Sequence, residues 1–203
     1  KPSVARDIAR VLKVTGKKEG FIDGNGYAIT WAFGHLVQLS DPDKYDPKFK
    51  RWNFYDLPII PDSFIKEVPR KDTTKKQFNV IKTLLSNKET QEVICATDAG
   101  REGELIFRLI YEQSKCKKPI KRLWISSQTD KAIKEGFNQL KPGEAFNPLF
   151  DSAMCRSEAD WLIGMNATRA YTIKFSQGAG VMSVGRVQTP VLKMIVDRHK
   201  AHT

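Results

Sequence analysis

Three carboxylates stand within seven positions of a chain that is otherwise rich in lysine and arginine. The stretch ATDAGREGEL, residues 96–105, contains Asp98, Glu102 and Glu104. The apolar run 93–95 precedes it, and an apolar helical pattern follows it. Carboxylates at a strand-to-helix corner can stabilise the positive end of the helix. They can also hold a hard cation such as Mg²⁺, which prefers oxygen ligands. The spacing alone leaves both interpretations open.

The position of this corner favours ligand binding. In open parallel sheets, ligands bind beyond the carboxyl ends of the strands, where the next helices begin. We expect Asp98 at such a strand end and Glu102 in the first turn of the helix, so both carboxylates can face one crevice. Gly100 and Gly103 would let a ligand approach the backbone closely. A magnesium ion held there would orient phosphates or stabilise a leaving oxygen. Glu104 lies further round the helix, where we assign it to capping.

The elements that must position this corner alternate between strands and helices. The patterns predict a strand at 92–97, a helix at about 102–114, a second strand at 121–126 and a helix that carries Ile133 and Phe137. Strands that alternate with helices imply a parallel sheet with helices on both faces. The predicted fold class is therefore α/β and Rossmann-like.

The segment before this series has three predicted parts. Residues 2–12 carry an amphipathic helical stripe directly at the start, so we expect a strand before them to be missing. The turn DGNG at 23–26, followed by apolar alternation up to Gly34 and His35, predicts a β-hairpin. Residues 41–72 are rich in proline, aspartate and lysine and predict a long irregular excursion. A helix follows around Phe78 and Leu85.

The last third of the chain predicts a second domain. The segment 140–148 has the proline, glycine and asparagine of a linker, and a long helix is expected at 149–175. The glycine-rich stretch 176–190 leads into a last helix. We therefore predict a first domain at 1–145 and a mainly helical second domain at 146–203, incomplete at its end.

Charge and composition limit the partners. The 203 residues include 34 Lys and Arg against 23 Asp and Glu, a net charge of +11. Such an excess favours a polyanionic partner, most often nucleic acid, although a merely basic soluble protein is the alternative. The three cysteines form no CxxC pair, which argues against a zinc site or a disulfide framework and favours a reducing cytoplasm. No apolar run is long enough for a membrane span. Apolar stripes around Trp31, Trp124 and Trp161 predict core positions.

Longer motifs resemble one known family. TDAGREGELI resembles the acidic motif of the TOPRIM domain in type IA DNA topoisomerases, where a DxDxE triplet holds magnesium beside the DNA. Further segments resemble that family in its own order, particularly its topoisomerase III branch. They are KPSVARDIA, ITWAFGHLVQL, LPIIPDSF, RLWISSQTDKAI, RSEADWLIGMNATRAYT and SVGRVQTPVL. The resemblance implies a TOPRIM domain followed by the beginning of the domain that binds single-stranded DNA.

The family's catalytic residues carry over unevenly. Asp98 and Glu102 match the first and third acids of the triplet, which implies that they are catalytic and hold Mg²⁺. Gly100 stands where the middle acid would be, so the resemblance implies fewer protein ligands for the metal. Lys1 matches the family's lysine near the scissile phosphate. The family's further catalytic glutamate immediately precedes this lysine and is not contained in the sequence.

Five residues match positions that contact DNA in the family. Arg156, Arg186 and Gln188 match residues that line the groove for the DNA strand, and Arg169 lies in the same motif region. His35 matches a residue that faces the catalytic crevice. Arginine on a helix face is usually solvated or paired with an acid, so the motif match rather than residue type supports these DNA contacts.

The resemblance also implies a nucleophile that these motifs lack. Family members break DNA by transesterification from a tyrosine in a separate domain, and none of the five tyrosines here lies in such a motif. We therefore expect a fragment of an ATP-independent topoisomerase that relaxes or decatenates DNA, inactive by itself. We also expect a monomer in the bacterial cytoplasm, at the nucleoid.

Three rival functions are consistent with parts of the pattern. A TOPRIM nuclease or primase would use the same acids to activate water or a nucleotide hydroxyl, but SVGRVQTP favours the topoisomerase architecture. A non-catalytic DNA-binding module would need only the basic surface. An aspartyl-phosphate domain also ends an apolar strand with aspartate, but it leaves the basic segments downstream without a role.

Overall fold

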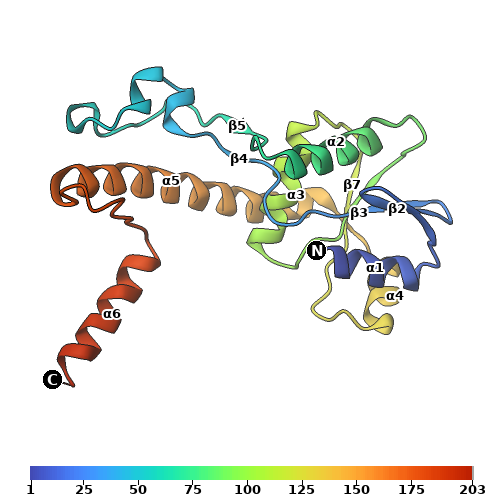
Figure 1. Ribbon diagram of the computed structural model, residues 1–203. Coiled ribbons are helices and arrows are strands. Elements are labelled where there is room, and N and C mark those ends of the chain that lie inside the picture. Colours follow the sequence, from blue (N-terminus) through green and yellow to red (C-terminus); the bar gives the residue numbers. More distant parts are fainter. Residues whose placement is uncertain (203) are drawn as a thin grey trace. The chain divides into compact units, whose positions relative to one another are not determined.

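The computed structural model describes residues 1–202 and divides into two compact units (Figure 1). Unit 1 consists of Lys1–Gln38 and Lys66–Met154, and unit 2 consists of Leu39–Ile65 together with the chain from Cys155 onward. The 39–65 excursion thus belongs to the same unit as the C-terminal helices. The domain boundary near residue 145 stays a prediction.

The central sheet of unit 1 contains a parallel pair of strands. Strand β6 (Val93–Cys95) runs parallel to β7 (Ile120–Arg122), and Cys95 stands opposite Arg122. The connection between them is helix α3 (Arg101–Gln113), as a parallel crossover requires. Strand β8 (Lys141–Pro142) adds an antiparallel edge to β7. The predicted α/β class is confirmed, with one antiparallel strand that the sequence pattern did not indicate.

Helices cover both faces of this sheet. On one face, α1 (Pro2–Val11) and α4 (Asp130–Asn138) contribute to a core of Ile8, Leu123 and Ile133. On the other face lie α3 and α2 (Asp72–Ser86), whose larger core contains Leu36, Val37, Phe78, Ile81, Leu105, Leu109, Ile110 and Ala153. Side chains alternate along a strand, so Leu123 enters the first core while its neighbour Arg122 meets α3.

A three-stranded antiparallel sheet precedes α2. It consists of β1 (Gly16–Lys18), β2 (Phe21–Gly24) and β3 (Tyr27–Thr30). The predicted hairpin is confirmed, since Asn25 and Gly26 form its two-residue turn with φ values of 48° and 77°. The expected second strand is too long, because pairing stops at Thr30 rather than at Gly34. The strand β1 was not predicted.

Unit 2 combines irregular chain with long helices. The excursion contains the short helices η1 (Pro42–Lys44), η2 (Pro47–Lys50) and η3 (Phe54–Asp56), and it lies between strands β4 (Gln38–Leu39) and β5 (Lys66–Glu67). After η4 (Gly143–Phe146), helix α5 (Asn147–Phe175) continues from unit 1 into unit 2. Helix α6 (Gln188–Lys200) ends the series. The predicted irregular excursion and both long helices are confirmed.

Trp161 on α5 joins the excursion to this helix. Its indole Nε1 donates a hydrogen bond of 2.9 Å to the carbonyl oxygen of Ser40. The rings of Tyr45 and Phe64 meet the indole ring edge-on, with distances of 5.6 and 5.5 Å between ring centroids. Trp161 is buried, as predicted. The expected core position is wrong for Trp124, which is 37% exposed and stacks on Phe146.

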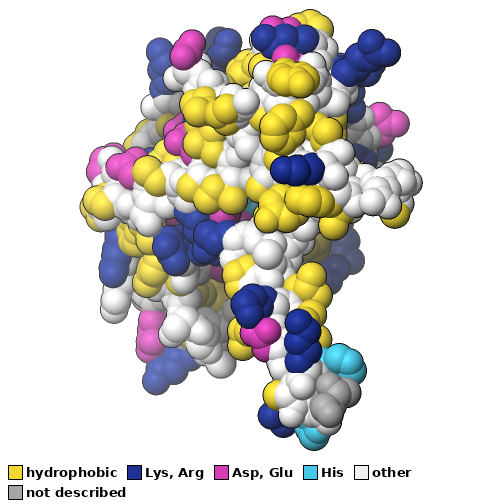
Figure 2. All heavy atoms as spheres, turned by 90° about the vertical axis from the view of Figure 1, so that its left-hand side faces the viewer, with side chains coloured by type: hydrophobic (Ala, Val, Ile, Leu, Met, Phe, Trp, Pro, Cys, Tyr) yellow, Lys and Arg dark blue, Asp and Glu magenta, His cyan; other side chains and the backbone are white. Residues whose placement is uncertain are grey.

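The surface of α6 is unusually apolar. Six large apolar side chains in and just before this helix are exposed. They are Val187, Val191, Leu192, Met194, Ile195 and Val196. Figure 2 shows yellow hydrophobic side chains beside charged ones along the same helix. None of the residues that the structure describes in α6 is buried.

Candidate functional site

The acidic corner lies where β6 ends and α3 begins. The side chains of Asp98 and Glu102 are 63% and 71% exposed, so both carboxylates face solvent. The Lys1 ammonium lies 3.4 Å from Asp98 Oδ2, and His35 Nε2 forms a hydrogen bond with Glu102 Oε1. The structure thus brings four sequence-predicted residues to one corner, each acid beside one basic side chain.

Two glycines shape the backbone at this corner. A Cβ atom at Gly103 would lie 2.1 Å from the carbonyl oxygen of Asp98, so the first turn of α3 sits directly against the Asp98 backbone. In addition, the Thr97 hydroxyl donates a 2.7 Å hydrogen bond to the carbonyl oxygen of Gly103. A Cβ atom at Gly100 would meet nothing within 4 Å. The position of the missing middle acid is therefore open space.

Glu104 has a different environment from the other two acids. It is only 1% exposed, and its Oε1 accepts a 2.9 Å hydrogen bond from Arg108 Nε. Its Oε2 lies 3.0 Å from Arg122 Nε. The carboxylate therefore contacts two arginines and not the free N–H groups at the start of the helix. The capping role expected from the sequence for Glu104 is not observed.

Arg122 is the functional-site residue that sequence reasoning missed. It is fully buried on β7, and its guanidinium donates to the carbonyl oxygens of Cys95, Thr97, Asp98 and Leu123 at 2.8–3.0 Å. The only sequence signal was an arginine directly before an apolar run, and such a residue is ordinarily taken as a solvated strand end.

Burial also affects the nearest thiol. Cys95 ends β6 with 1% exposure, and this burial raises the pKa of its thiol. The pKa is raised because burial disfavours the thiolate, an effect only partly offset by the nearby guanidinium of Arg122. Cys95 is therefore the small buried apolar residue expected from a strand in the core.

The donor set at the corner fits magnesium. Asp98 and Glu102 offer exposed carboxylate oxygens, and Mg²⁺ commonly binds one or two carboxylates together with water and phosphate oxygens. Within residues 1–202, no group of three or more candidate ligand side chains is gathered. Two carboxylates at this corner would leave coordination sites of a bound ion open for water and phosphate oxygens.

A second cluster lies in unit 2 around Asp160. Arg186 donates to both of its carboxylate oxygens, at 2.6 and 3.1 Å, and Arg156 Nε lies 3.8 Å away. The hydrogen bond from Arg186 holds the pKa of the Asp160 carboxyl below its usual value. Two of the arginines predicted to contact DNA therefore share one acid.

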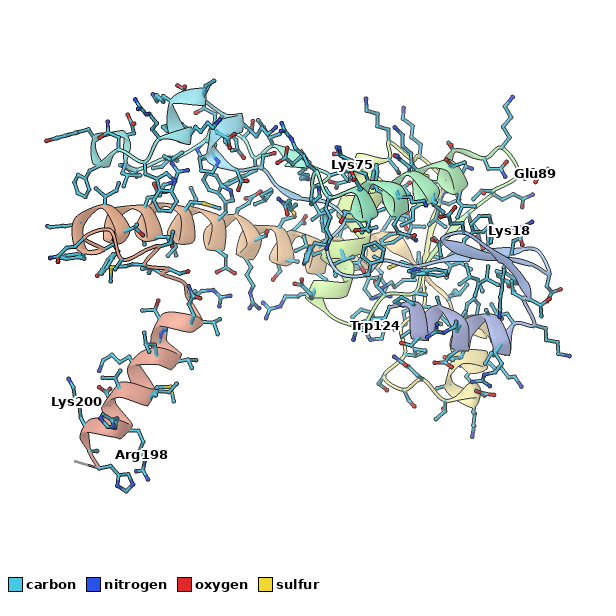
Figure 3. All side chains as sticks on the ribbon, viewed as in Figure 1. Lys18, Lys75, Glu89, Trp124, Arg198 and Lys200 are labelled. Carbon is cyan, nitrogen blue, oxygen red and sulfur yellow. The ribbon has the colours of Figure 1, made fainter. Side chains whose placement is uncertain are left out.

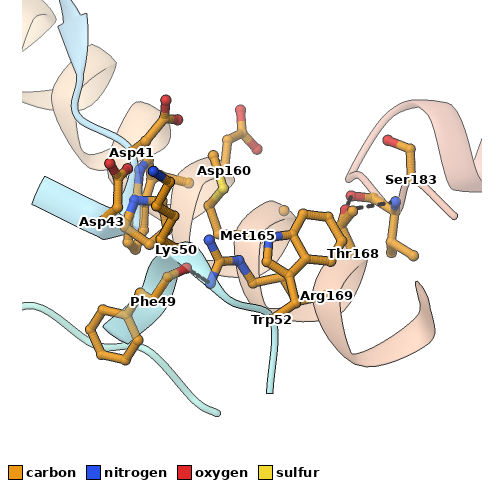
Figure 4. Close-up of a pocket in the computed structure, with 14 residues that line it drawn as sticks. Asp41, Asp43, Phe49, Lys50, Trp52, Asp160, Met165, Thr168, Arg169 and Ser183 are labelled. Carbon is orange, nitrogen blue, oxygen red and sulfur yellow. Dashed lines mark hydrogen bonds between the residues drawn. The ribbon is translucent and has the colours of Figure 1, made fainter. Parts of the chain in front are cut away.

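Asp160 also lines a cavity of about 550 Å³ within unit 2 (Figure 4). Arg169 lies in its wall and is 7% exposed, with Nη1 donating 2.8 Å to the carbonyl oxygen of Phe49 and its guanidinium 5.2 Å from the ring of Trp52. Burial lowers the pKa of this guanidinium. The cavity combines an aromatic ring with charged groups of both signs.

Gln188 is linked to the same cavity indirectly. Its side-chain amide donates a 2.6 Å hydrogen bond to the hydroxyl of Ser183, which lines the cavity. All four predicted DNA-contact residues other than His35 therefore lie in unit 2, around Asp160 or the cavity wall. His35 lies in unit 1, at the acidic corner.

Membrane-spanning helices are not found in the part of the chain from residue 1 to 202, where every helix is too short or too polar to cross a bilayer. Basic side chains instead project from the surface elements of unit 1, for example Lys18 on β1 and Lys75 on α2 (Figure 3).

Comparison with protein families finds two matches. The Toprim domain matches residues 1–128, and the family described as DNA topoisomerase matches residues 144–203. The acidic corner falls in the first match and the Asp160 cluster in the second.

Individual relatives agree with these families. The chain is 56% identical over 198 residues to DNA topoisomerase 3 from Bacillus cereus, and 54% identical to its counterpart from Bacillus subtilis. Each alignment covers 98% of this chain but 26% of the relative, so the chain spans about a quarter of their length. DNA topoisomerase 3 from Staphylococcus epidermidis is 52% identical. The predicted resemblance is confirmed.

A solved structure has the same fold. Full-length topoisomerase I from Thermotoga maritima superimposes with a TM-score of 0.65 at 21% identity, and the match covers 98% of this chain and 29% of that chain. At this identity the likeness supports the fold alone.

Proposed function

The chain belongs to the Toprim domain family, and on that premise we propose that it is the amino-terminal part of a type IA DNA topoisomerase of the topoisomerase III kind. The observation that carries the proposal is the 56% identity to DNA topoisomerase 3 over 198 residues. It is supported by the corner where Asp98 and Glu102 face solvent together with Lys1. The activity belongs to the longer protein that contains such a chain.

The corner supplies the metal-dependent part of this function. Asp98 and Glu102 would hold Mg²⁺, which neutralises phosphate charge and helps to orient the 3′-hydroxyl when broken DNA is resealed. Lys1 adds a positive charge next to Asp98, where a scissile phosphate would lie. His35 holds the Glu102 carboxylate by a hydrogen bond and so limits its rotation.

The second cluster supplies contacts to a DNA strand. The Arg186 guanidinium is exposed, and Asp160 already orients its two donors as a phosphate would require. Arg156 and Gln188 flank it, and phosphate contacts of this kind fix the register of a strand without reading its sequence. Arg169 is buried in the cavity wall, so it would contact only a group that enters the cavity.

Strand cleavage requires a group from outside the 203 residues. A tyrosine in another domain of the longer protein would attack a DNA phosphate, forming a 5′-phosphotyrosine bond while the bond from phosphorus to the 3′-oxygen breaks. After a second strand has passed, the released 3′-hydroxyl would attack the phosphotyrosine, which reseals the DNA and frees the tyrosine. Energy from ATP is not needed, because transesterification conserves the energy of the phosphodiester bond. We place this activity in the bacterial cytoplasm, at the nucleoid, and expect a monomer.

Two alternatives use the same residues. A Toprim nuclease or primase would need the acidic corner but not the segment 144–203, whose match to the DNA topoisomerase family therefore favours our proposal. A non-catalytic DNA-binding module would need the basic side chains but not exposed carboxylates at a strand-to-helix corner.

Relaxation of negatively supercoiled plasmid tests the proposal. The longer protein containing this chain is incubated with plasmid, with and without Mg²⁺, beside an Asp98→Asn variant. Glu135→Gln is the matched control, because it also removes one exposed carboxylate of unit 1 but lies on α4. We expect stepwise relaxation that needs Mg²⁺, falls at least tenfold in Asp98→Asn and is unchanged in Glu135→Gln.

Other outcomes separate the alternatives. Plasmid that is nicked without resealing would support the nuclease. Plasmid that is bound but unaltered at every Mg²⁺ concentration would support the binding module. Equal activity in Asp98→Asn and wild type would remove the acidic corner from the mechanism.

A further inference from the structure

A buried arginine lies directly behind the acidic corner. Arg122 is completely shielded from solvent, so its guanidinium is out of reach of DNA phosphates. Burying a charge is costly unless the charge is paired and hydrogen-bonded. The five donors of a guanidinium form a rigid planar fork, which suits a task that requires several fixed contacts at once.

The contacts of Arg122 converge on the segment that carries Asp98. Strand pairing with β7 ends at Cys95, whose carbonyl oxygen accepts from Leu123 N. Beyond it, Arg122 Nη1 donates to the carbonyl oxygen of Thr97 at 2.9 Å, and Nη2 donates to that of Asp98 at 2.8 Å. Arg122 therefore holds the backbone at Thr97 and Asp98, beyond the last residue of β6 that is paired with β7.

Glu104 connects this arginine to the helix that carries Glu102. Its Oε2 lies 3.0 Å from Arg122 Nε, and Arg108 from the next turn of α3 holds the other oxygen at 2.9 Å. The two acids of the corner come from separate segments, the end of β6 and the start of α3. A rigid link between these segments fixes the distance between the two acids.

We infer that Arg122, together with Glu104, is the positioning device of the acidic corner, because it holds the backbone of Asp98 against the start of the helix that carries Glu102. The inference rests on the proposed magnesium-dependent function and assigns that site two residues which never touch the metal or DNA. Groups that orient metal ligands from behind commonly change metal affinity 10- to 100-fold when they are altered.

Arg122→Lys is the most direct test. Lysine keeps a positive charge next to Glu104 but cannot reach the carbonyl oxygens of Thr97 and Asp98 with a planar fork. Arg108→Lys is the matched control, because Arg108 contacts the same Glu104 but donates its other hydrogen bonds to Gly143 and Asn147, away from the corner.

Mg²⁺ binding to the longer protein is measured by calorimetry without DNA, beside circular dichroism and plasmid relaxation over a range of Mg²⁺ concentrations. We expect the Mg²⁺ dissociation constant to rise about tenfold or more in Arg122→Lys and to change less than twofold in Arg108→Lys. Raising the Mg²⁺ concentration in proportion to the dissociation constant should restore plasmid relaxation by Arg122→Lys. A variant that is only less stable would not be restored in this way.

Several results would overturn the inference. If Arg122→Lys lost stability but kept its Mg²⁺ affinity, Arg122 would have only a structural role. If Arg122→Lys did not fold, Glu104→Gln would take its place, and a folded Glu104→Gln protein with wild-type Mg²⁺ affinity would equally refute positioning. A wild-type protein that binds no Mg²⁺ would defeat the proposed function and this inference together. If the wild-type protein relaxes plasmid in a Mg²⁺-dependent way and Arg122→Lys binds Mg²⁺ with the same affinity, only this inference is refuted and the proposed function stands.

Discussion

Replacement of Gly103 by alanine tests how tightly α3 is seated on the acidic corner. The added Cβ atom would lie 2.1 Å from the carbonyl oxygen of Asp98 and 2.9 Å from its backbone nitrogen. Cβ atoms in proteins do not approach other heavy atoms more closely than 3.0 Å. Because both partners are backbone, no rotation of a side chain can relieve the contact. The start of α3 and the Asp98 segment must move apart by about 1 Å.

Two opposing free-energy contributions set the change in stability caused by Gly103→Ala. Alanine favours a helix over glycine by about 1 kcal/mol. Forcing extra volume into a packed contact costs about 1–3 kcal/mol, and a contact between two backbone segments belongs at the upper end. We expect a net loss of about 1–2 kcal/mol in the free energy of unfolding. The displaced Asp98 should also weaken Mg²⁺ binding about tenfold.

Chemical denaturation followed by circular dichroism measures the loss of stability, and calorimetry measures Mg²⁺ binding. Gly100→Ala is the matched control, since it adds the same methyl group three residues earlier, where nothing lies within 4 Å. The φ of Gly100 is 170°, an extended conformation that alanine adopts readily. We expect its stability to stay within about 1 kcal/mol of wild type.

A particular pattern of results would refute this reasoning. If Gly103→Ala matched Gly100→Ala in both stability and Mg²⁺ affinity, the start of α3 would not be held against Asp98. The close approach would then have no part in arranging the corner.

Three further predictions follow from individual residues. Gly100→Asp fills open space with the missing middle acid, so calorimetry should find Mg²⁺ binding roughly tenfold tighter; unchanged affinity would contradict the geometry. Burial raises the pKa of the Cys95 thiol, so alkylation at neutral pH followed by mass spectrometry should modify exposed Cys155 well before Cys95. The pKa of Asp160 is lowered by Arg186, so their contact stabilises the protein fully above the unfolded pKa, near 3.8, and is lost as pH falls through the lower folded pKa. Titration by carboxyl NMR signals should find Asp160 ionised below pH 3.8, and an ordinary midpoint would contradict this contact.

Local features of the fold were predictable because their causes lie within a few residues. Asn25 and Gly26 adopt positive φ values that few other residue pairs tolerate, which explains why the hairpin was predicted correctly. The order of strands and helices around β6 and α3 follows from apolar periodicity alone. Element ends were less predictable, as β3 shows by stopping at Thr30, because hydrogen bonding to a neighbour rather than side-chain pattern ends a strand.

Side-chain burial was predicted less well where two elements meet. Trp124 lies in an apolar stripe but is 37% exposed, because it covers the ring of Phe146 and the guanidinium of Arg122 from outside. Trp161 lies in a similar stripe and is buried by the excursion, which adds a layer over α5. Periodicity identifies an apolar face but not which segment covers it.

The sequence by itself determined which two acids meet at the corner, because Asp98 and Glu102 lie four positions apart and one strand-to-helix turn brings them together. Only the tertiary structure decided which other residues join them. His35 reaches Glu102 across 67 positions, and Arg122 reaches the Asp98 carbonyl across 24. The same fold buries Glu104 while its neighbour two positions away faces solvent. The physical reason is that residue type alone fixes the charge of a side chain. Its burial and its long-range contacts depend instead on how distant segments of the chain pack over one another.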